Sequence, residues 1–594
     1  MTSDENDEIR KYERVRWQSR RRELAVKARK EPTPLGRGDL VGLTLIIGLY
    51  VVLTHRFFWP PLAKALNLKT PGLWFNDDAF ITFRYAKHIA EGHGYVWNIV
   101  DPVAVEGSTS LGWCLLNALG IAMGFSPLTL SHYVGLASAV AAMIILYLCG
   151  RKMAALNGAL ALFAVAFLAF QRQWIVWGVS GMETRTATLL VFVATLVMIW
   201  EIRRKRRIAW ISAILFFLAT IFRPEAPLLH LAAAGGAFSA TGLGREAGNE
   251  RRTRIFTIVT SGLLHGVLLL ILTLGRFLYF GKPLPNTFYA KVGAAQFDDG
   301  IPYLWNFLWQ THAWTWLPLL VLALLFARGL RRLTAYTFAV QIAALTLWLL
   351  YEGGGRWEFR FFDVALPPIA WLTAIGLAEI SERFRPKKKV RRWMIPALLA
   401  LLLVAQLSAI LTPFRWFGEV YSAQTLLRAA RVGLQEGSIL SRYLGPNDRI
   451  CTGWAGAIPY VTDAWHFDPW GLNDPNNRTK RFDPSLPLFH QRYATWEDVV
   501  AADVTFVDIY NDFLWPTPYP DGGLTGAPVT PWAKAGEMVY SIKLPEGLYF
   551  IFSSPRPRED IVRWARERRL TLQYSVPLPA GVPQIFRSAK ENRP

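Results

Sequence analysis

Long apolar runs, separated by short polar or basic segments, set the pattern of this chain. Runs of about 17–25 mostly apolar residues are typical of membrane-spanning helices. They predict about eleven spans, at residues 40–58, 130–149, 155–170, 186–201, 208–222, 226–240, 255–275, 309–327, 333–350, 364–381 and 393–411. The chain is therefore predicted to be a polytopic α-helical membrane protein.

The basic segments between these runs predict the orientation of the chain. Lys and Arg gather at residues 203–207, 251–254, 328–332 and 383–392, and such clusters favour cytoplasmic loops. The first outer loop is then 59–127. A further apolar stretch, 111–122, would invert every later basic loop if it crossed the bilayer. We therefore expect it to be an amphipathic helix on the outer surface.

Composition agrees with an integral membrane protein. The chain has 594 residues, of which 52% are hydrophobic, and a mean hydropathy of +0.22. The net charge of +21 lies mainly in the segments between spans, so it indicates topology and contact with the lipid bilayer. No nucleic-acid partner is predicted, although nucleic acid is the weaker alternative reading of this charge. The three cysteines have no metal or redox spacing.

Three parts of the chain differ in pattern. Residues 1–38 are polar and basic, which predicts a cytoplasmic segment, and no cleavage-site pattern follows the first apolar run, which predicts a retained anchor. Residues 39–411 hold all the predicted spans. The tail, 412–594, alternates short β-prone runs with helix-like stretches. We expect it to form a mixed α/β domain on the extracytoplasmic side.

Polar clusters that break the apolar pattern all fall on the predicted outer face. Ionisable residues at membrane depth are costly and tend to mark function, so we expect the clusters to share one cavity. They are Asp77-Asp78 with Arg84, Glu106-Gly107-Ser108, Ser180-Gly181-Met182-Glu183, Arg223-Pro224-Glu225, the segment with Asn286, Tyr289 and Lys291, and the segment with Glu352, Arg356 and Arg360. The structural alternatives are a solvated turn for the Asp pair, a mutual ion pair for Arg223 and Glu225, and a helix start at Ser180.

The residue types in these clusters suit a substrate that carries a phosphate. Arg and Lys bind phosphate oxygens, while one carboxylate of Asp77-Asp78 takes a proton from an attacking hydroxyl. Asp77 is preferred as the base, without separating the two roles. The candidate phosphate ligands are Arg84, Arg223, Lys291, Arg356 and Arg360, with Glu183, Glu225, Asn286 and Tyr289 as further substrate contacts. Adjacent carboxylates also suit Mg²⁺ or Mn²⁺, so metal dependence stays open.

Residues 77–86, Asp-Asp-Ala-Phe-Ile-Thr-Phe-Arg-Tyr-Ala, carry a family resemblance. With the segments that follow, the chain resembles the polyprenyl-phosphate-dependent GT-C glycosyltransferases. It is most similar to the terminal β-(1→2) arabinofuranosyltransferases of mycobacterial and corynebacterial cell walls. The matching segments occur in order between about residues 40 and 473. They are 91–98, 106–107, 180–184, 223–225, 281–291, 360–362, 366–367, 455–460 and 468–472.

This resemblance implies a specific reaction. An arabinofuranosyl residue is transferred with inversion from decaprenylphosphoryl-arabinofuranose to an arabinan acceptor of arabinogalactan or lipoarabinomannan, on the outer face of the plasma membrane. It also implies that Asp77 and Asp78 are catalytic. Relatives often carry Gly-Gly-Asp-Trp where this chain has Gly354-Gly355-Arg356-Trp357. The alternatives are a mannosyl or aminosugar transferase on the same scaffold, a lipid-linked sugar transporter, and a noncatalytic glycan-binding protein.

Overall fold

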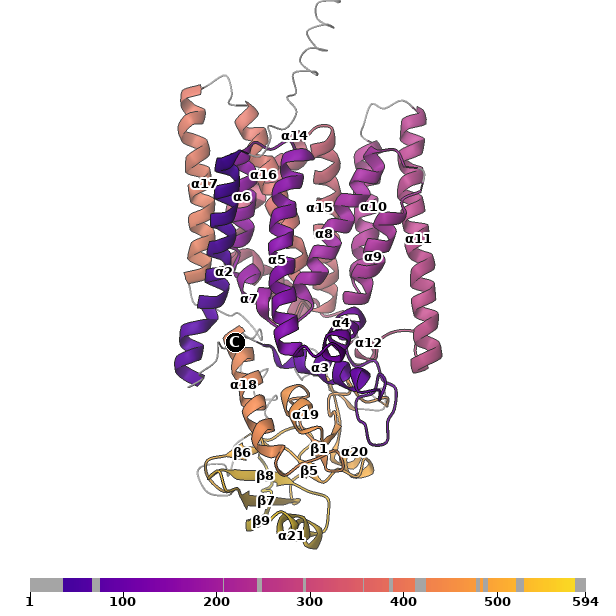
Figure 1. Ribbon diagram of the computed structural model, residues 1–594, viewed down its shortest axis with the longest axis vertical. Helices are drawn as coiled ribbons and strands as arrows, with labels where there is room; N and C mark the ends of the chain where they lie inside the picture. The colour runs from indigo at the N-terminus through magenta and orange to yellow at the C-terminus, as the bar shows by residue number, and fades with distance from the viewer. Residues whose placement is uncertain are drawn as a thin grey trace, which may run out of the picture.

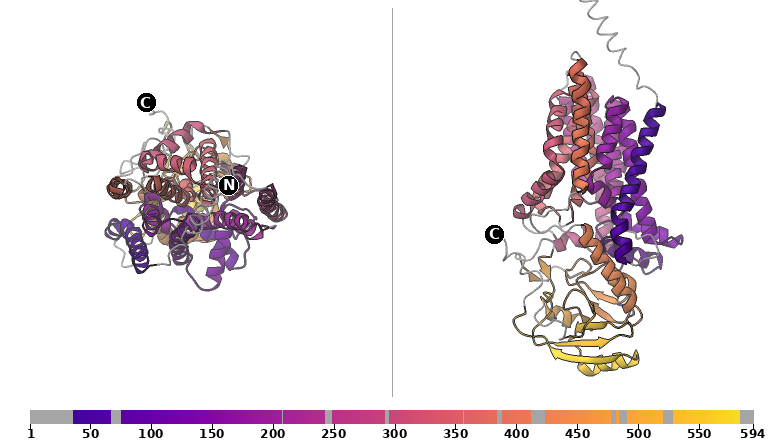
Figure 2. Two further views of the ribbon diagram at one scale, coloured as in Figure 1. Left: turned by 90° about the horizontal axis from the view of Figure 1, so that it is seen from above. Right: turned by 90° about the vertical axis from the view of Figure 1, so that its left-hand side faces the viewer.

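A bundle of long helices stands on a smaller domain that contains the strands (Figure 1). The computed structural model describes residues 36–66, 75–206, 208–242, 248–291, 295–355, 357–383, 388–411, 423–476, 481–483, 490–519 and 528–582. Figure 2 shows the same two layers from the side, with the β-rich domain at one end of the bundle.

Seven helices among the described residues are long and apolar enough to cross a membrane. They form from the apolar runs that the sequence pattern identified. These helices are α2 (Arg37–Leu66), α5 (Pro127–Lys152), α8 (Thr184–Arg203), α11 (Gly248–Phe280), α15 (Leu330–Glu352), α16 (Leu366–Arg383, continuing from η2, Arg360–Ala365) and α17 (Lys388–Leu411). The chain is thus a multi-pass membrane protein.

Two further predicted spans are bent pairs of helices. The helix α6 (Gly158–Ala169) turns by 67° into α7 (Arg172–Val176) and η1 (Trp177–Val179), and α13 (Phe297–Gln310) turns by 94° into α14 (Ala313–Phe326). Counting each pair as one span raises the described total to nine. Pro318 lies inside α14 and Pro302 inside α13.

The predicted count of eleven is higher than this total because two predicted spans are short. The helices α9 (Trp210–Phe222) and α10 (Ala226–Gly242) form a hairpin where the spans 208–222 and 226–240 were predicted, with 13 and 17 residues. At 1.5 Å per residue, α9 is about 20 Å long, less than the ~30 Å hydrocarbon core of a bilayer. Length and composition therefore do not make α9 and α10 spans of their own.

Buried polar side chains join this hairpin to its neighbours. Ser212 of α9 donates to the Glu201 carboxylate of α8 (2.5 Å) and lies 3.0 Å from the hydroxyl of Ser261 of α11. His230 of α10 contacts Ser261 (3.0 Å) and His265 (2.7 Å) through its two ring nitrogens. Because unpaired polar groups are costly away from water, this chain of bonds fixes α9 and α10 against α8 and α11.

The stretch 111–122 forms one short helix, α4 (Leu111–Ala122), of 12 residues. It packs beside α3 (Asp77–Ala90), at the end of the bundle nearest the β-rich domain (Figure 1). A helix of this length does not cross a bilayer, which agrees with the expected surface helix.

A mixed sheet forms the core of the second domain. Its strand order is β2-β1-β5-β8-β7-β9, and β6 pairs with β8. Strand β1 is parallel to β2 and β5, and the other pairs are antiparallel. The strands are β1 (Arg449–Cys451), β2 (Trp465–Phe467), β5 (Phe506–Val507), β6 (Leu514–Trp515), β7 (Met538–Lys543), β8 (Tyr549–Ser553) and β9 (Thr571–Pro577).

Helices and a separate small hairpin complete this domain. The helices are α18 (Ala423–Leu440), α19 (Ala457–Thr462), α20 (Trp496–Ala501) and α21 (Arg558–Glu567), and the hairpin pairs β3 (Arg481–Phe482) with β4 (Arg492–Tyr493). The predicted mixed α/β tail is confirmed. Residues 1–35 and 412–422 lie outside the described ranges, so the predicted domain limits at 38 and 411 stay predictions.

Candidate active site

Helix α3 connects the bundle to the β-rich domain, and it begins at the aspartate pair. The amide of Asn76, its N-cap residue, donates to the Ser180 carbonyl (3.2 Å). The Asp77 side chain is buried, and both of its oxygens accept from the other domain: Oδ2 from the Gly456 amide (3.0 Å) and Oδ1 from the Ala457 amide (2.9 Å). A Cβ at Gly456 would lie 2.5 Å from Oδ2, so the close approach requires glycine.

Burial raises the pKa of Asp77 to about 7. The charge of Asp78 acts in the same direction, while the hydrogen bonds from Ala457 and Gly456 oppose it. Asp77 therefore titrates near neutral pH, and its protonation state bears on the contact between α3 and α19.

The neighbouring Asp78 has different surroundings. Its side chain is half-buried, and within the described ranges its carboxylate has no hydrogen-bond partner. The negative charge of Asp78 acts on Lys291, which lies at the end of α12 (Asn286–Lys291). Burial lowers the pKa of Lys291, as do Arg360 and Arg223, while Asp78 and Glu352 oppose the shift. Asp78 thus lies within electrostatic reach of Lys291, which belongs to a cluster with Arg360 and Arg223.

That cluster is a network of largely buried ion pairs. Arg223 pairs with Glu183 (2.9 Å) and with Glu225 (2.6 Å), and Arg360 pairs with Glu183 (3.1 Å). Burial raises the pKa of Glu183, but Arg360 and Arg223 outweigh it and hold the pKa below its usual value. The predicted convergence of Glu183, Arg223, Glu225 and Arg360 is therefore present in the structure.

One donor in this network is unused. The Nε of Arg360 is buried and has no hydrogen-bond partner among the described residues. A buried donor without a partner is costly, and an anion beside it would remove that cost. Arg360 and Arg223 also border a small cavity of about 20 Å³.

Arg84 does not belong to this cluster. Its buried guanidinium donates to the carbonyls of Trp97 (2.9 Å), Ala464 (2.8 Å) and Pro459. Burial lowers its pKa to about 10. The structure therefore uses this residue to join α3 to the β-rich domain rather than to present a charge to a substrate.

Asn286 also connects the two domains. Its Nδ2 donates to the carbonyls of Gly471 (3.2 Å), Leu472 (2.9 Å) and Asp474 (2.8 Å). Tyr289 is half-buried, with the Lys282 ammonium 5.5 Å from its ring centre. Arg356 lies outside the described residues.

Glu106, in another predicted cluster, has a partner of its own. Its carboxylate accepts from the Arg276 Nε (2.8 Å) and Nη2 (2.9 Å). It therefore supports the loop that follows α3 against α11, and it has no part in the ion pairs of Glu183.

The donor set for a divalent cation is incomplete. Among the described residues, no three His, Cys, Asp or Glu side chains form a group that suits a metal ion. Both Asp77 oxygens also face backbone N–H groups, which leaves Asp78 as the one carboxylate of the pair open to a ligand. The residues that the structure describes do not make a Mg²⁺ or Mn²⁺ site, and we derive no step through a cation.

Sequence reasoning missed the partners of Asp77. Gly456 and Ala457 lie in the stretch 455–460 that carried the resemblance. Their backbone amides, however, give no local signal of a contact some 380 positions away. Glu352 was named in a polar cluster but not among the candidate substrate contacts, although its charge acts on Lys291.

Solved structures share this fold. The archaeal oligosaccharyltransferase AglB from Archaeoglobus fulgidus, in complex with an inhibitory peptide and a dolichol-phosphate, aligns with a TM-score of 0.50 and 11% identity. The alignment covers 93% of this chain and 77% of AglB. The apo form gives the same TM-score, with 87% and 74% coverage. The chain therefore has the fold of the GT-C membrane glycosyltransferases.

The remaining comparisons do not extend the assignment beyond the fold. ArnT from Cupriavidus metallidurans bound to undecaprenyl phosphate aligns with a TM-score of 0.45 and 11% identity, over 72% of this chain and 86% of ArnT. A family model described as a domain of unknown function (DUF8728) matches residues 419–548, within the tail. No curated protein matches this chain.

Proposed function

We propose that this protein transfers a sugar from a polyprenyl-phosphate donor to a hydroxyl of a glycan acceptor. The observation that carries the proposal is the position of Asp78, a half-buried carboxylate whose charge acts on Lys291, on which the charges of Arg223 and Arg360 also act. The proposed base and the cations lie at the same end of a helix bundle that has the GT-C fold.

In this proposal each group acts on one part of the displacement. The acceptor hydroxyl attacks the anomeric carbon from the side opposite the phosphate, and Asp78 takes its proton. The bond between that carbon and the phosphate oxygen breaks, and the oxygen leaves with the electron pair. Lys291, Arg360 and Arg223 stabilise the negative charge that develops on the lipid phosphate. The product has the inverted anomeric configuration.

The structure changes which aspartate we assign as the base. The sequence favoured Asp77, but both of its oxygens accept from the amides of Gly456 and Ala457. Asp78 has no such partners in the described parts of the chain. Asp77 then positions α3, and with it Asp78, against the β-rich domain.

The donor and acceptor are proposed from the sequence resemblance. They are decaprenylphosphoryl-arabinofuranose and an arabinan chain, with the reaction on the extracytoplasmic side. A mannosyl or aminosugar donor is the second candidate, because Arg356 replaces the Asp that relatives often carry at this position.

A transfer assay with purified full-length protein tests the proposal. Lipid-linked arabinofuranose, mannose and aminosugar donors are supplied in turn, and consumption of each donor is measured. Wild-type protein is expected to use the arabinofuranosyl donor. Asp78→Asn is expected to lose about 10²–10⁴-fold in rate, the usual contribution of a general base. Glu91→Gln, an exposed change at the other end of α3, is the matched control.

Consumption of the mannosyl donor alone would reject the donor assignment and keep the mechanism. Wild-type rates in Asp78→Asn would reject Asp78 as the base. If the wild-type protein uses none of the lipid-linked sugars, the proposed function is wrong.

A further inference from the structure

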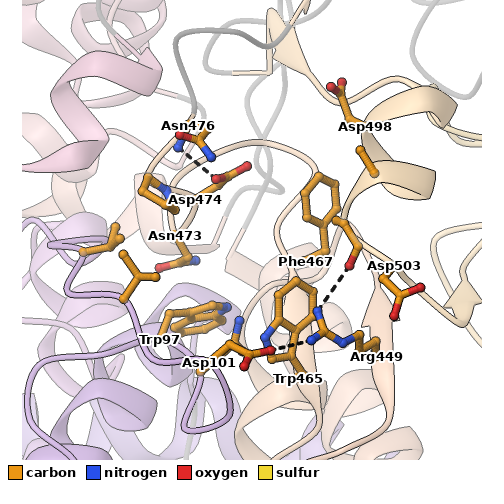
Figure 3. A pocket seen from close by; sticks show the side chains of 16 residues that line it. Trp97, Asp101, Arg449, Trp465, Phe467, Asn473, Asp474, Asn476, Asp498 and Asp503 are labelled. Atoms are coloured by element: carbon orange, nitrogen blue, oxygen red, sulfur yellow. Dashed lines mark hydrogen bonds and ion pairs between the residues drawn. The ribbon is translucent and has the colours of Figure 1, made fainter.

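A second polar site lies between the β-rich domain and the outer loop that follows α3. It is a groove with a volume of about 410 Å³, within the ~300–1,000 Å³ range of ligand pockets. Trp97 and Asp101 of the outer loop face Arg449 and Trp465 of the sheet (Figure 3). Asp474 and Asn476 lie at another side of the groove.

This groove has far fewer cations than the cluster around Lys291, where Lys291, Arg223 and Arg360 lie together. Its lining includes Asp101, Asp474, Asp498 and Asp503. Arg449, which also lines it, is paired with Asp101 (2.5 Å). The remaining carboxylates repel a phosphate-bearing ligand. The groove is therefore unsuited to the lipid-phosphate donor.

A divalent cation is also a poor fit. The described residues contain no group of three carboxylate, histidine or cysteine side chains placed for a metal. Several of the carboxylates have local partners: Asp498 closes the capping box of α20, and Asp503 pairs with Arg556 (2.5 Å). They are spread around the groove rather than directed at one point.

The aromatic and amide groups suit a neutral saccharide. Arg449 covers the Trp465 ring, with 4.3 Å between its guanidinium carbon and the ring centre, and so restrains that ring. The Trp465 indole N–H is buried without a hydrogen-bond partner in the described ranges. Sugar hydroxyls both donate and accept, so one ligand can satisfy an indole N–H, carboxylates and amides together. The apolar C–H face of a sugar ring also packs on an aromatic side chain.

The walls of this groove are bonded directly to α3. Tyr85 donates to the Asn473 side chain (3.1 Å), and Arg84 donates to the Trp97 carbonyl (2.9 Å) and to Asn98 (3.2 Å). Tyr85 lies two helical turns beyond Asp78, or about 10 Å along the axis at 1.5 Å per residue. One helix therefore carries both the proposed base and the anchor of the groove.

We propose that this groove binds a neutral oligosaccharide. That the oligosaccharide is the acceptor chain rests on the proposed function. In that case the groove holds sugar residues at a distance from the end that reacts, and a longer acceptor binds more tightly than a short one.

Binding to purified full-length protein tests the groove without any transfer. The probes are linear arabinan, mannan and galactan oligosaccharides, with a cationic chitosan oligosaccharide and a sulfated oligosaccharide of matched length. At least one neutral probe is expected to bind. Trp465→Ala is expected to weaken its Kd about ten-fold, as for a buried aromatic contact, and Trp465→Phe less. Glu497→Ala, an exposed change beside Asp498 on α20, is the matched control.

Asp474→Ala combined with Asn476→Ala keeps the test decisive if Trp465→Ala does not fold. This rim variant retains every aromatic side chain and is expected to weaken binding several-fold at an unchanged melting temperature. Unchanged affinity in the rim variant would overturn the proposal. So would tighter binding of the cationic or the sulfated probe, or no binding of any neutral probe.

The two proposals fail in different ways. Asp78→Asn is expected to bind the neutral probe with wild-type affinity while losing transfer. If wild-type protein transfers sugar but binds no oligosaccharide in the groove, the groove is rejected alone. If it binds the oligosaccharide but uses no lipid-linked sugar, the proposed function is rejected alone.

Discussion

The two polar sites of this protein differ in their cations although both adjoin helix α3. The cluster near its start holds three cations, Lys291, Arg223 and Arg360, among carboxylates, and adjoins the bundle. The groove two turns further along is rich in carboxylates and adjoins the sheet. An anionic lipid phosphate suits the first site and a neutral glycan the second. Charge alone would then keep the donor out of the groove.

After the loss of the proposed base, the largest expected effect comes from weakening the cationic site. Arg360→Lys keeps one positive charge but removes the planar set of donors, including the unpartnered Nε. We expect transfer to fall about 10²–10³-fold, as when one stabilising donor is lost from a transition state. Oligosaccharide binding in the groove should be unchanged, measured on the same preparation. An equal loss at both sites would break the distinction between them.

The next largest effect is expected at the contact between Asp77 and the backbone of the β-rich domain, which positions α3. In the wild-type protein, the backbone N–H groups of Gly456 and Ala457 donate to the Asp77 carboxylate. Asp77→Asn replaces one of these acceptor oxygens with an NH₂ group, so that two donors face each other. We expect a loss of about 1–3 kcal/mol in stability, the cost of an unsatisfied buried donor. Thermal unfolding of the purified protein measures it. Asp101→Asn, exposed and outside this contact, should stay close to wild type.

A pH dependence follows from the same contact and from the sheet domain. Burial raises the pKa of Asp77 to about 7 and that of Glu436 to about 8. Both groups bind a proton more tightly in the folded protein than in the unfolded chain. Their contribution to the free energy of unfolding is therefore largest below about pH 4 to 5. It falls as pH rises through 7 and 8. Melting temperatures between pH 5 and 9 should decrease by a few degrees, and Glu436→Gln should flatten the slope.

The smallest expected effect is a difference between the two sites in how strongly salt weakens ligand binding. Exposed charge interactions are screened over about 10 Å at 0.1 M salt. Donor binding at the cationic cluster should weaken several-fold between low and high ionic strength. Binding of a neutral oligosaccharide in the groove should change less than about two-fold, because its contacts do not require a charged ligand. Equal salt dependence at the two sites would contradict their assignment to different ligands.

Much of the fold followed from the sequence because lipid restricts the chain to long apolar helices. Nine of the predicted spans satisfy length and composition once bent pairs are counted. The hairpin α9–α10 was harder to predict, because short helices stay buried through long-range bonds such as His230 with Ser261. Apolar composition shows neither the length of a helix nor the partner of a buried histidine.

The site was predictable in its residue types and less so in their roles. The convergence of Glu183, Arg223 and Arg360 followed from placing the polar clusters on one face. Arg84 and Asp77 had the same apparent chemistry, but burial gave them backbone partners in the other domain. The local sequence around Arg84 and Asp77 does not indicate such distant partners. The groove is assembled from segments far apart in the chain, so local sequence did not indicate it.

The division of roles between Asp77 and Asp78 is the central claim, and a single-turnover rate tests it most directly. Each Asp→Asn variant is saturated with lipid-linked donor, mixed with acceptor, and followed at a temperature where both are folded. We predict that Asp78→Asn loses at least about a hundred-fold in the chemical step, while Asp77→Asn loses less than about ten-fold. The reverse order, with Asp77→Asn inactive and Asp78→Asn close to wild type, would contradict the account.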